Sequence, residues 1–358
     1  MMKIAIVYDA IYPYVKGGAE KRIYDVAKVL SKNHEVHLFG MKYWGGENIL
    51  KSGDIYLHGV CNSISLYNKN GERSLVQPIY FSFYLFKTLK KFDFDLIECQ
   101  NFPYLPCFVS KFYSIVRKKP LVIMWIEIWK DLWKKRRLLG YLGSMTEKMC
   151  FRLTKNNLVL TKETGERLGR KFTIFPVGID LEKIKKCKAI EDKLDIIYVG
   201  RLIKDKKVDL LLRAVKDLNL KICVIGDGPE RNKLIDLADE LKLDVQFTGF
   251  LESDREVYSY MKSSKILVLP SIREGFGVVV LEGLACGCKI ITTNHKDNNA
   301  KELVDENFVC NASMEGLREV IKSGLNNRYN NKIKLDEYDI KKVTEKIEKY
   351  YQGCINEN

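Results

Sequence analysis

The chain has 358 residues, of which 46% are hydrophobic and 30% charged, and its formal net charge is +14. This length exceeds what one doubly wound domain usually needs, so we expect two domains. The apolar runs are shorter than the roughly 18 to 20 residues of a membrane-spanning helix, which excludes an integral membrane protein. The ten cysteines have no disulfide or metal-ligand spacing. Because the first residues form an apolar strand rather than a secretory signal, we expect reduced thiols and a cytoplasmic location.

The positive charge is concentrated in the first half of the chain. Residues 1–180 contain 29 Lys and Arg against 16 Asp and Glu, whereas residues 181–358 contain 31 against 30. A basic half predicts an anionic partner, such as a membrane surface, a phosphorylated lipid or a nucleic acid. The alternative is an ordinary solvated surface, which is how most charge runs are used.

Two segments of this basic half are candidates for membrane contact. Residues 134–137 are all Lys or Arg and adjoin three tryptophans spaced four apart, which a helix would place on one face: Trp125, Trp129 and Trp133. The alternative for Trp125 is that it belongs to the strand expected before this segment. We therefore expect the N-terminal domain to dock on the inner face of an anionic membrane through this cluster. The aromatic run at residues 78–86, with lysines after it, could also lie on a membrane. For this run we favour a buried helix packed on the first sheet, because aromatic side chains prefer protein interiors.

Short β-branched runs alternate with amphipathic segments of helical length, which is the pattern of βαβ units around parallel sheets. In the first half, the expected strands are residues 4–8, 36–39, 96–99, 121–125, 158–160 and 172–175. In the second half, they are residues 194–199, 220–225, 245–248, 266–269 and 289–292. Clear helical patterns cover residues 19–31, 207–218 and 230–241.

A break at residues 176–180, followed by a Lys-rich stretch, separates the two halves. We expect an α/β protein with two doubly wound, Rossmann-like domains that face a central cleft, where the ligands of such sheets bind. The predicted parts are a first domain, a linker, a second domain and a final helix that packs back on the first domain: residues 1–178, 179–193, 194–336 and 337–358.

The most distinctive motif is residues 271–282, directly after an expected strand. Gly275 and Gly277 flank Phe276 at a turn from strand to helix. Such a turn leaves backbone N–H groups pointing at an anion, and the helix N-terminus adds its positive dipole end.

Two carboxylates accompany this turn. Glu274 lies in the turn itself, and Glu282 lies roughly one and a half helical turns into the segment. Carboxylates placed in this way can bind hydroxyl groups on two parts of one ligand, such as a sugar and a ribose. The alternative is a tight turn with two surface glutamates, and the other motifs of this half argue against it.

Three more strand ends of the second half are followed by residues suited to binding a phosphate or a base ring. Arg201 and Lys206 follow the expected strand at residues 194–199, where two cations suit a pyrophosphate. Gly226 lies in a glycine-rich turn before the next helix. Phe250 follows the strand after it, at a position where the backbone can contact a base ring.

In this order and spacing the motifs resemble glycosyltransferase family 4, the retaining enzymes of the GT-B fold. Glu274 and Glu282 match the family's E-x7-E signature, and the segment from Gly200 to Lys206 matches its G-R-L-x-x-x-K motif. In the first half, Gly17 and Gly18 match the Gly-Gly loop that opens a helix after the first strand. The resemblance covers essentially the whole chain and is weakest between residues 43 and 119, where acceptor sites normally diverge.

The resemblance implies a metal-independent hexosyltransferase that needs no cofactor. Its substrates would be a nucleotide-sugar donor, with UDP or GDP, and a lipid-linked or polysaccharide acceptor. Glu282 would bind the donor ribose, Glu274 the hydroxyls of the transferred sugar, and Arg201 and Lys206 the leaving diphosphate. The backbone of four residues would contact the donor: Gly275, Phe276, Gly277 and Val278. In such enzymes a donor phosphate oxygen takes the acceptor proton, so the resemblance demands no protein base.

One position departs from the family pattern. Many members have a histidine after the strand that corresponds to residues 121–125, followed by a carboxylate. Ile126 stands at the histidine position, and Glu127 keeps the neighbouring carboxylate as a candidate substrate ligand. This departure implies either a different acceptor geometry or a slow or inactive enzyme, and the retained charged residues of the second half favour activity.

Two other functions fit parts of the pattern. A nucleotide-sugar epimerase of the same fold would keep the donor motifs but would need acid and base groups at the reacting centre. A nucleic-acid-binding protein would spread basic and aromatic residues along a groove, whereas the half with the nucleotide-binding turns is nearly neutral. We therefore expect no specific nucleic-acid partner. The four histidines lack metal-ligand spacing, and we expect no metal site.

Overall fold

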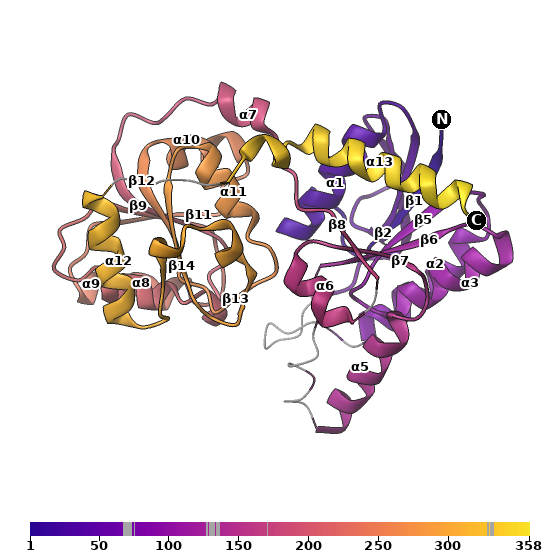
Figure 1. Cartoon of the computed structure of the whole chain (residues 1–358), viewed down its shortest axis with the longest axis horizontal. Coiled ribbons are helices and arrows are strands. Elements are labelled where there is room, and N and C mark those ends of the chain that lie inside the picture. Colours follow the sequence, from indigo (N-terminus) through magenta and orange to yellow (C-terminus); the bar gives the residue numbers. More distant parts are fainter. Residues whose placement is uncertain are drawn as a thin grey trace. The chain divides into compact units, whose positions relative to one another are not determined.

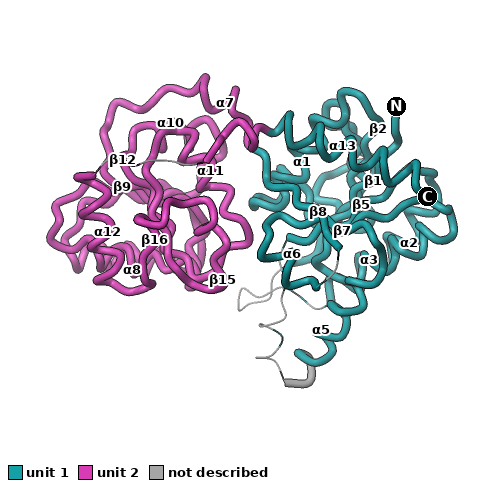
Figure 2. The backbone as a smooth tube through the Cα atoms, in the orientation of Figure 1, with its two compact units in different colours: residues 1–178, 340–358 teal, residues 179–339 magenta. Residues whose placement is uncertain are grey.

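The structure is a computed structural model that describes residues 1–66, 74, 76–126, 128, 133, 137–169, 171–327, 329 and 333–358. The chain forms two compact units, one of residues Met1–Gly178 with Ile340–Asn358 and one of residues Ile179–Asp339 (Figure 2). Each unit contains a largely parallel sheet with helices around it, so the predicted α/β class is confirmed (Figure 1).

The sheet of unit 1 has eight strands in the order β3-β4-β2-β1-β5-β6-β7-β8. Neighbouring strands are parallel, except that β3 runs antiparallel to β4. The strands are β1 (Lys3–Val7), β2 (Glu35–Lys42), β3 (Ile49–Ser52), β4 (Ile55–Asn62), β5 (Leu96–Gln100), β6 (Leu121–Trp125), β7 (Asn156–Val159) and β8 (Thr173–Ile174). Every residue of β5 and β6 is buried, as expected of central strands covered on both faces.

The helices of unit 1 cover both faces of this sheet. They are α1 (Gly18–Leu30), α2 (Val76–Leu89), α3 (Leu105–Arg117), α5 (Arg137–Cys150), α6 (Lys162–Leu168) and α13 (Ile340–Asn356). Helix α1 connects β1 to β2, toward the β3 edge of the sheet. Helix α2 connects β4 to β5 and α3 connects β5 to β6, both toward the β8 edge. Right-handed crossovers therefore put α1 on one face, and α2 with α3 on the other. The last helix, α13, packs beside α1 (Figure 1).

The sheet of unit 2 has six parallel strands in the order β11-β10-β9-β12-β14-β16. The elements of this unit are α7 (Leu181–Lys186), β9 (Leu194–Val199), η1 (Lys204–Lys206), α8 (Val208–Ala214), β10 (Ile222–Ile225), α9 (Arg231–Glu240), β11 (Val245–Gly249), α10 (Asp254–Lys262), β12 (Ser264–Leu269), β13 (Arg273–Glu274), α11 (Val278–Ala285), β14 (Lys289–Thr293), β15 (Asp297–Asn298), η2 (Asn299–Leu303), η3 (Glu306–Phe308), β16 (Val309–Cys310), α12 (Met314–Asn326) and η4 (Leu335–Tyr338). The short strands β13 and β15 pair with each other outside the main sheet.

Several boundaries differ from those expected. Residues 179–193 were expected as a linker, but they include α7 and belong to unit 2. The final helix begins at Ile340 rather than at residue 337, because residues 335–338 form a separate 3-10 turn of unit 2. The sequence pattern also missed β3, β4 and β16. In β4 a histidine and a glycine interrupt the apolar alternation, and β16 has only two residues.

The expected exposed face of three tryptophans is wrong for the two that the structure describes. Trp125 is the last residue of β6 and is completely buried, with its indole N–H donating to Asn157 Oδ1 at 2.8 Å. Trp133 is also buried and lies near the ring of Tyr104. Both side chains belong to the core of unit 1, where burial removes their large apolar area from water. Trp129 and residues 134–136 lie outside the described residues.

A buried histidine pair joins β2 and β4. His37 Nδ1 lies 2.7 Å from His58 Nε2, and His37 Nε2 lies 2.8 Å from Glu35 Oε1. Phe39 stacks on the His58 ring with 4.3 Å between centroids. Burial, with the neighbouring His37, lowers the pKa of His58 to about 3, and burial also lowers the pKa of His37. Both rings are therefore neutral at pH 7.

This pair predicts a loss of stability in mild acid. The pKa of His58 is lower in the folded than in the unfolded chain, so the unfolded chain binds more protons between about pH 3 and 6.5. Between pH 7 and pH 5 the free energy of unfolding should fall by about 2 kcal/mol more in the wild type than in His58→Gln. Urea unfolding followed by tryptophan fluorescence measures this, because all four tryptophans lie in unit 1. His295→Gln, in unit 2, is the control, and equal pH dependence of wild type and His58→Gln would contradict the prediction.

Candidate active site

The strand order of unit 2 reverses at β9, which has β10 on one side and β12 on the other. The chain runs outward from β9 through β10 to β11, and then returns to β12 and runs outward the other way. Ligands of open α/β sheets bind beyond the carboxyl ends of the strands at such a reversal. The loops that follow β9 and β12 therefore form the candidate site, and they contain most of the predicted residues.

An ion pair connects these two loops. Lys206 Nζ, after β9, lies 2.5 Å from Glu274 Oε1, after β12. Their side chains are only 17% and 13% exposed. The backbone N–H of Ile272 donates to the carbonyl of Asp205 at 3.0 Å, which joins the same two loops again. The structure thus brings together two residues that are 68 positions apart in the sequence.

Buried polar side chains behind Glu274 fix its position. Ser271 is fully buried, and its hydroxyl donates to Glu274 Oε1 at 2.8 Å. The Ser271 carbonyl accepts hydrogen bonds from the Thr293 hydroxyl at 2.5 Å and from Asn298 Nδ2 at 3.2 Å. Asn299 Nδ2 donates to the carbonyl of Gly275 at 3.1 Å. The sequence analysis missed these supports. The available signal was two consecutive asparagines shortly after β14, the strand next to β12.

The glycine-rich turn leads directly into α11. Gly277 is the N-cap of this helix with a φ of +79°, and a Cβ there would lie 2.5 Å from the Cβ of Ala300. Glycine is therefore the residue that fits this position. Phe276 is buried and its ring lies 6.5 Å from that of Tyr338. Val278 is the first helical residue, and the first hydrogen bond of this end runs from the Val280 N–H to the Gly277 carbonyl at 2.9 Å. The N–H groups of Val278 and Val279 precede that bond and lie at the positive end of the helix dipole.

Glu282 lies further along α11 and has different surroundings from Glu274. It is 9% exposed, and its Oε1 accepts a hydrogen bond of 2.9 Å from the hydroxyl of Tyr258 in α10. Tyr258 is itself almost completely buried. The two carboxylates of the motif are therefore positioned by separate partners, which suits contact with separate parts of one ligand.

The ends of β9, β10 and β11 continue side by side as glycine turns. The N–H of Gly200 donates to the Ile225 carbonyl at 3.0 Å, and the N–H of Gly226 donates to the Gly249 carbonyl at 2.8 Å. A Cβ at Gly226 would lie 2.0 Å from the carbonyl oxygen of Gly200, so no other residue fits there. Phe250 directly follows Gly249, at the end of β11, and is half-exposed.

Arg201 begins the loop after β9 and is exposed. Its carbonyl accepts a hydrogen bond of 3.0 Å from the hydroxyl of Tyr198, the penultimate residue of that strand. Burial raises the pKa of Tyr198, the negative charge of Glu274 raises it further, and the positive charge of Arg201 opposes them. The phenol therefore stays protonated, and both charged groups act on the same ring.

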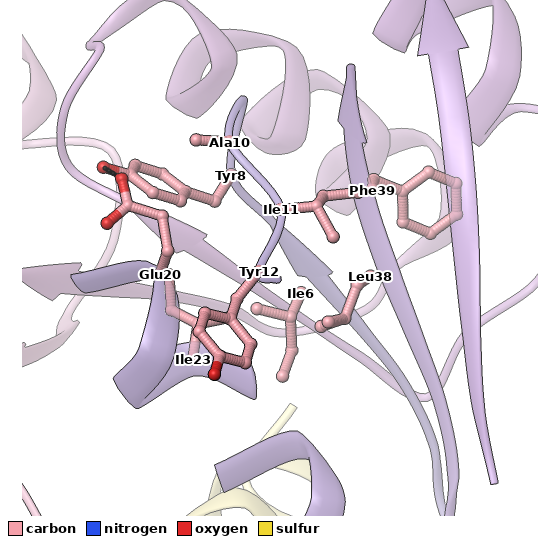
Figure 3. Close-up of a pocket in the computed structure, with 9 residues that line it drawn as sticks. All are labelled: Ile6, Tyr8, Ala10, Ile11, Tyr12, Glu20, Ile23, Leu38 and Phe39. Atoms are coloured by element: carbon pink, nitrogen blue, oxygen red, sulfur yellow. Dashed lines mark hydrogen bonds between the residues drawn. The ribbon is translucent and has the colours of Figure 1, made fainter. Parts of the chain in front are cut away.

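The predicted residues of unit 1 lie near the end of β1. Gly17 is the N-cap of α1, Gly18 is its first residue, and Glu20 lies in its first turn. Figure 3 shows a small pocket beside them, with apolar walls, where the Tyr8 hydroxyl meets the Glu20 carboxylate; this hydrogen bond is 3.4 Å long. These residues follow β1 at the strand reversal of unit 1, where β1 lies between β2 and β5.

Ile126 occupies the position at which the family pattern has a histidine. Its side chain is half-buried, and its backbone N–H donates to Asn101 Oδ1 at 3.0 Å. Asn101 follows β5 and is completely buried. An apolar side chain here cannot donate or accept a proton. Glu127 lies outside the described residues.

Within the described ranges, no group of three or more His, Cys, Asp or Glu side chains is placed to hold a metal ion. In the same part of the chain no helix combines the length and the apolar composition needed to cross a bilayer. The absence of a metal in the reaction remains a prediction.

Two relatives that match most or all of the chain are glycosyltransferases. The chain is 28% identical to a Campylobacter jejuni protein named N-acetylgalactosamine-N,N'-diacetylbacillosaminyl-diphospho-undecaprenol 4-alpha-N-acetylgalactosaminyltransferase, over 99% of this chain and 100% of the relative. It is 26% identical to a second Campylobacter jejuni enzyme, named an alpha-1,4-N-acetyl-D-galactosaminyltransferase that acts on a GalNAc-containing diNAcBac-PP-undecaprenol, over 86% and 83% of the two chains.

Solved structures show the same fold. Sucrose-phosphate synthase from Thermosynechococcus elongatus superposes with a TM-score of 0.79 at 14% identity, over 100% of both chains. Anabaena HepE, solved with UDP and glucose, superposes with a TM-score of 0.72 at 16% identity, over 99% of this chain and 100% of the other. Both are glycosyltransferases of the GT-B type, so the predicted fold class is confirmed.

Two family models together match nearly the whole chain. The model of glycosyl transferases group 1 matches residues 180–353, and that of Glycosyltransferase Family 4 matches residues 16–183. The first match contains the ion pair and the glycine turn, and the second contains Gly17, Gly18 and Glu20 at the start of α1. The chain belongs to glycosyltransferase family 4.

Proposed function

We propose that the chain transfers a hexose from a UDP- or GDP-sugar to a lipid-linked or polysaccharide acceptor, with retention of the anomeric configuration and without a metal. The observation that carries this proposal is the Lys206–Glu274 pair at the strand reversal of unit 2. This pair would offer a cation to a phosphate and a carboxylate to sugar hydroxyls. The UDP and glucose in the Anabaena structure are consistent with such a donor.

The donor diphosphate would bind to cations of the loop after β9. Arg201 is exposed there and Lys206 is only 17% exposed, so one is accessible and the other is already partly desolvated. A partly desolvated cation interacts more strongly with phosphate than a solvated one. The N-terminus of α11 supplies N–H donors and its dipole to the same anion.

The two carboxylates would divide the remaining groups of the donor. Glu274, held by Lys206 and Ser271, would accept hydrogen bonds from hydroxyls of the transferred sugar. Glu282, held by Tyr258, would accept those of the ribose. Gly226 and Phe250, on the neighbouring strand ends, would contact the base.

In the reaction the bond between the anomeric carbon and the diphosphate oxygen breaks, and its electron pair leaves with the diphosphate. The acceptor hydroxyl oxygen bonds to the same face of that carbon, and its proton passes to a donor phosphate oxygen. Arg201 and Lys206 would stabilise the negative charge that develops on the leaving diphosphate. Stabilisation of developing charge by fixed groups is usually the largest single contribution to the rate enhancement of an enzyme. The chain then needs no proton acceptor of its own, in agreement with Ile126 at the histidine position.

A lipid-linked acceptor is supported by both Campylobacter relatives, whose names specify undecaprenol-linked substrates. The positive excess of residues 1–180 suits the diphosphate of such a lipid. The epimerase and nucleic-acid alternatives are not favoured, because both of these relatives, matched over most or all of their length, are transferases.

The function predicts nucleoside diphosphate release that depends on an acceptor and continues in EDTA. The assay combines UDP-N-acetylgalactosamine, UDP-glucose or GDP-mannose with an undecaprenyl diphosphate-linked sugar, and follows free UDP or GDP together with the labelled lipid. A donor present at about 100 times its Kd should also stabilise the chain by about 2.7 kcal/mol, which a thermal shift detects. Donor isomerisation without release would point to an epimerase. Activity that is lost in EDTA and restored by manganese would disprove metal independence.

Replacing Arg201 with Ala should slow transfer by about 100-fold or more, because one partner of the developing charge is lost. The residue is exposed, so the free energy of unfolding should change little. Arg213→Ala, an exposed arginine of α8, is the matched control. Near-normal turnover of Arg201→Ala would contradict the assignment of the diphosphate site.

The two carboxylates should separate in their effects. Glu282→Ala should weaken binding of the free nucleoside diphosphate, whereas Glu274→Ala should leave that binding intact and reduce turnover. Tyr258→Phe keeps the Glu282 carboxylate but removes the hydroxyl that positions it, so this variant separates the effect of losing the carboxylate from the effect of misplacing it. Calorimetric titration with UDP and GDP measures the first effect and the release assay the second. Equal effects of both changes on nucleotide affinity would contradict this division.

A further inference from the structure

Helix α2 has apolar side chains on its outer face as well as on its inner face. Phe81 and Leu85 are fully buried against the sheet. Four other apolar side chains follow one another at intervals of three or four residues and are exposed to solvent by 68%, 62%, 56% and 43%: Val76, Ile79, Phe83 and Phe86. This spacing puts them on a single stripe of the helix, away from the core.

Helix α3 packs beside α2 and extends this stripe (Figure 1). Phe112, Ile115 and Val116 are exposed by 52%, 62% and 60%. The ring of Phe112 contacts that of Phe86 edge to face, with 5.4 Å between centroids. The outer sides of the two helices therefore form one apolar surface, which we name the α2–α3 face. Contiguous apolar surface of this kind marks an interaction site in a water-soluble domain.

All ionised side chains on the two helices of the α2–α3 face are basic. Neither helix contains an Asp or Glu. The lysines and arginines on the helices or directly after them are Lys87, Lys90, Lys91, Lys111, Arg117, Lys118 and Lys119. Lys87 Nζ lies 4.2 Å from the centroid of the Phe83 ring, so cation and aromatic side chain are adjacent. Acidic residues that flank the two helices in the sequence include Glu72, Asp93 and Asp95, and Asp95 pairs with Lys119 at 3.8 Å.

We propose that the α2–α3 face docks unit 1 on the surface of an anionic lipid bilayer. The exposed aromatic and aliphatic side chains would enter the boundary between headgroups and acyl chains, and the lysines around them would bind the anionic headgroups. A second copy of the chain fits this face poorly, because a symmetric dimer would bring two basic surfaces together. The proposal concerns a surface of unit 1 that contains none of the donor residues, and it replaces the tryptophan face predicted from the sequence.

The test is flotation with vesicles of phosphatidylcholine containing about one-third phosphatidylglycerol, with pure phosphatidylcholine for comparison, and it needs neither donor nor acceptor. The wild type should float with the anionic vesicles at low salt and be released at high salt. Replacing Lys87, Lys90 and Lys91 with Ser should weaken binding about 100-fold, since each lysine near the surface contributes a factor of about five. The control replaces three exposed lysines of unit 2 with Ser: Lys216, Lys233 and Lys322.

A second pair of variants tests the apolar contribution. Phe83→Ser with Ile115→Ser should abolish flotation at moderate salt while leaving the tryptophan fluorescence and the unfolding transition of unit 1 unchanged, because both side chains are exposed. Met314→Ser, an exposed apolar residue of unit 2, should float as the wild type does.

Three results would overturn the proposal. One is a wild type that ignores anionic vesicles at low salt. Another is flotation of the Phe83→Ser, Ile115→Ser variant at wild-type strength. The third is a wild-type dimer that does not bind vesicles and that this variant dissociates, which would assign the face to a second copy of the chain.

Discussion

Lys206 and Glu274 are joined where two neighbouring strands of unit 2, β9 and β12, lead their connections in opposite directions. Both charges are largely removed from water, and such charges are costly unless each has a partner. Ser271 supplies a further hydrogen bond to the carboxylate. Removing one member would leave the other buried without its charged partner, at a cost in stability, while the backbone hydrogen bond from Ile272 to Asp205 would still join the two loops.

This constraint also limits what can bind. A ligand that draws Lys206 toward itself must offer a negative group, and a ligand that takes up Glu274 must offer hydrogen-bond donors in place of the ammonium. A sugar attached to a diphosphate meets both conditions in one molecule. For the donor proposed above, the pair would hold both side chains close to each other before binding, so that less ordering would be needed when the donor binds.

A second buried cluster explains why the final helix belongs to unit 1. Arg22 of α1, Glu98 of β5 and Tyr351 of α13 are almost completely buried. The Tyr351 hydroxyl donates to Glu98 Oε2, and burial raises the pKa of Tyr351 well above its usual value. Burial lowers the pKa of Arg22, which the charge of Glu98 opposes. These contacts, with an apolar stripe on α13, hold the last residues of the chain against its first helix.

The sequence predicted those site residues whose chemistry is visible one residue at a time. Arg201, Lys206 and Glu274 are charges at strand ends, and Gly226 and Gly277 interrupt patterns that otherwise form strands or helices. The supports of the site could not be found in this way, because a buried serine, tyrosine or asparagine is informative only through its partner. Asn298 reaches Ser271 from 27 positions further along the chain, and Tyr258 reaches Glu282 from 24 positions before it. Such pairings are decided by the register of the strands and not by local sequence.

For the aromatic segment at residues 78–86, the sequence alone likewise could not predict which side chains are exposed. Its expected role as a core helix is correct for Phe81 and Leu85, whereas Ile79, Phe83 and Phe86 are exposed. A uniformly apolar helix has no polar residues to mark its outer side, so its periodicity cannot tell which side is covered. The neighbouring helix and the charges settle the question, because α3 continues the exposed stripe and every ionised side chain on both helices is basic. Part of the positive excess of the first half is therefore arranged around an apolar surface, which a purely solvated basic face would not need.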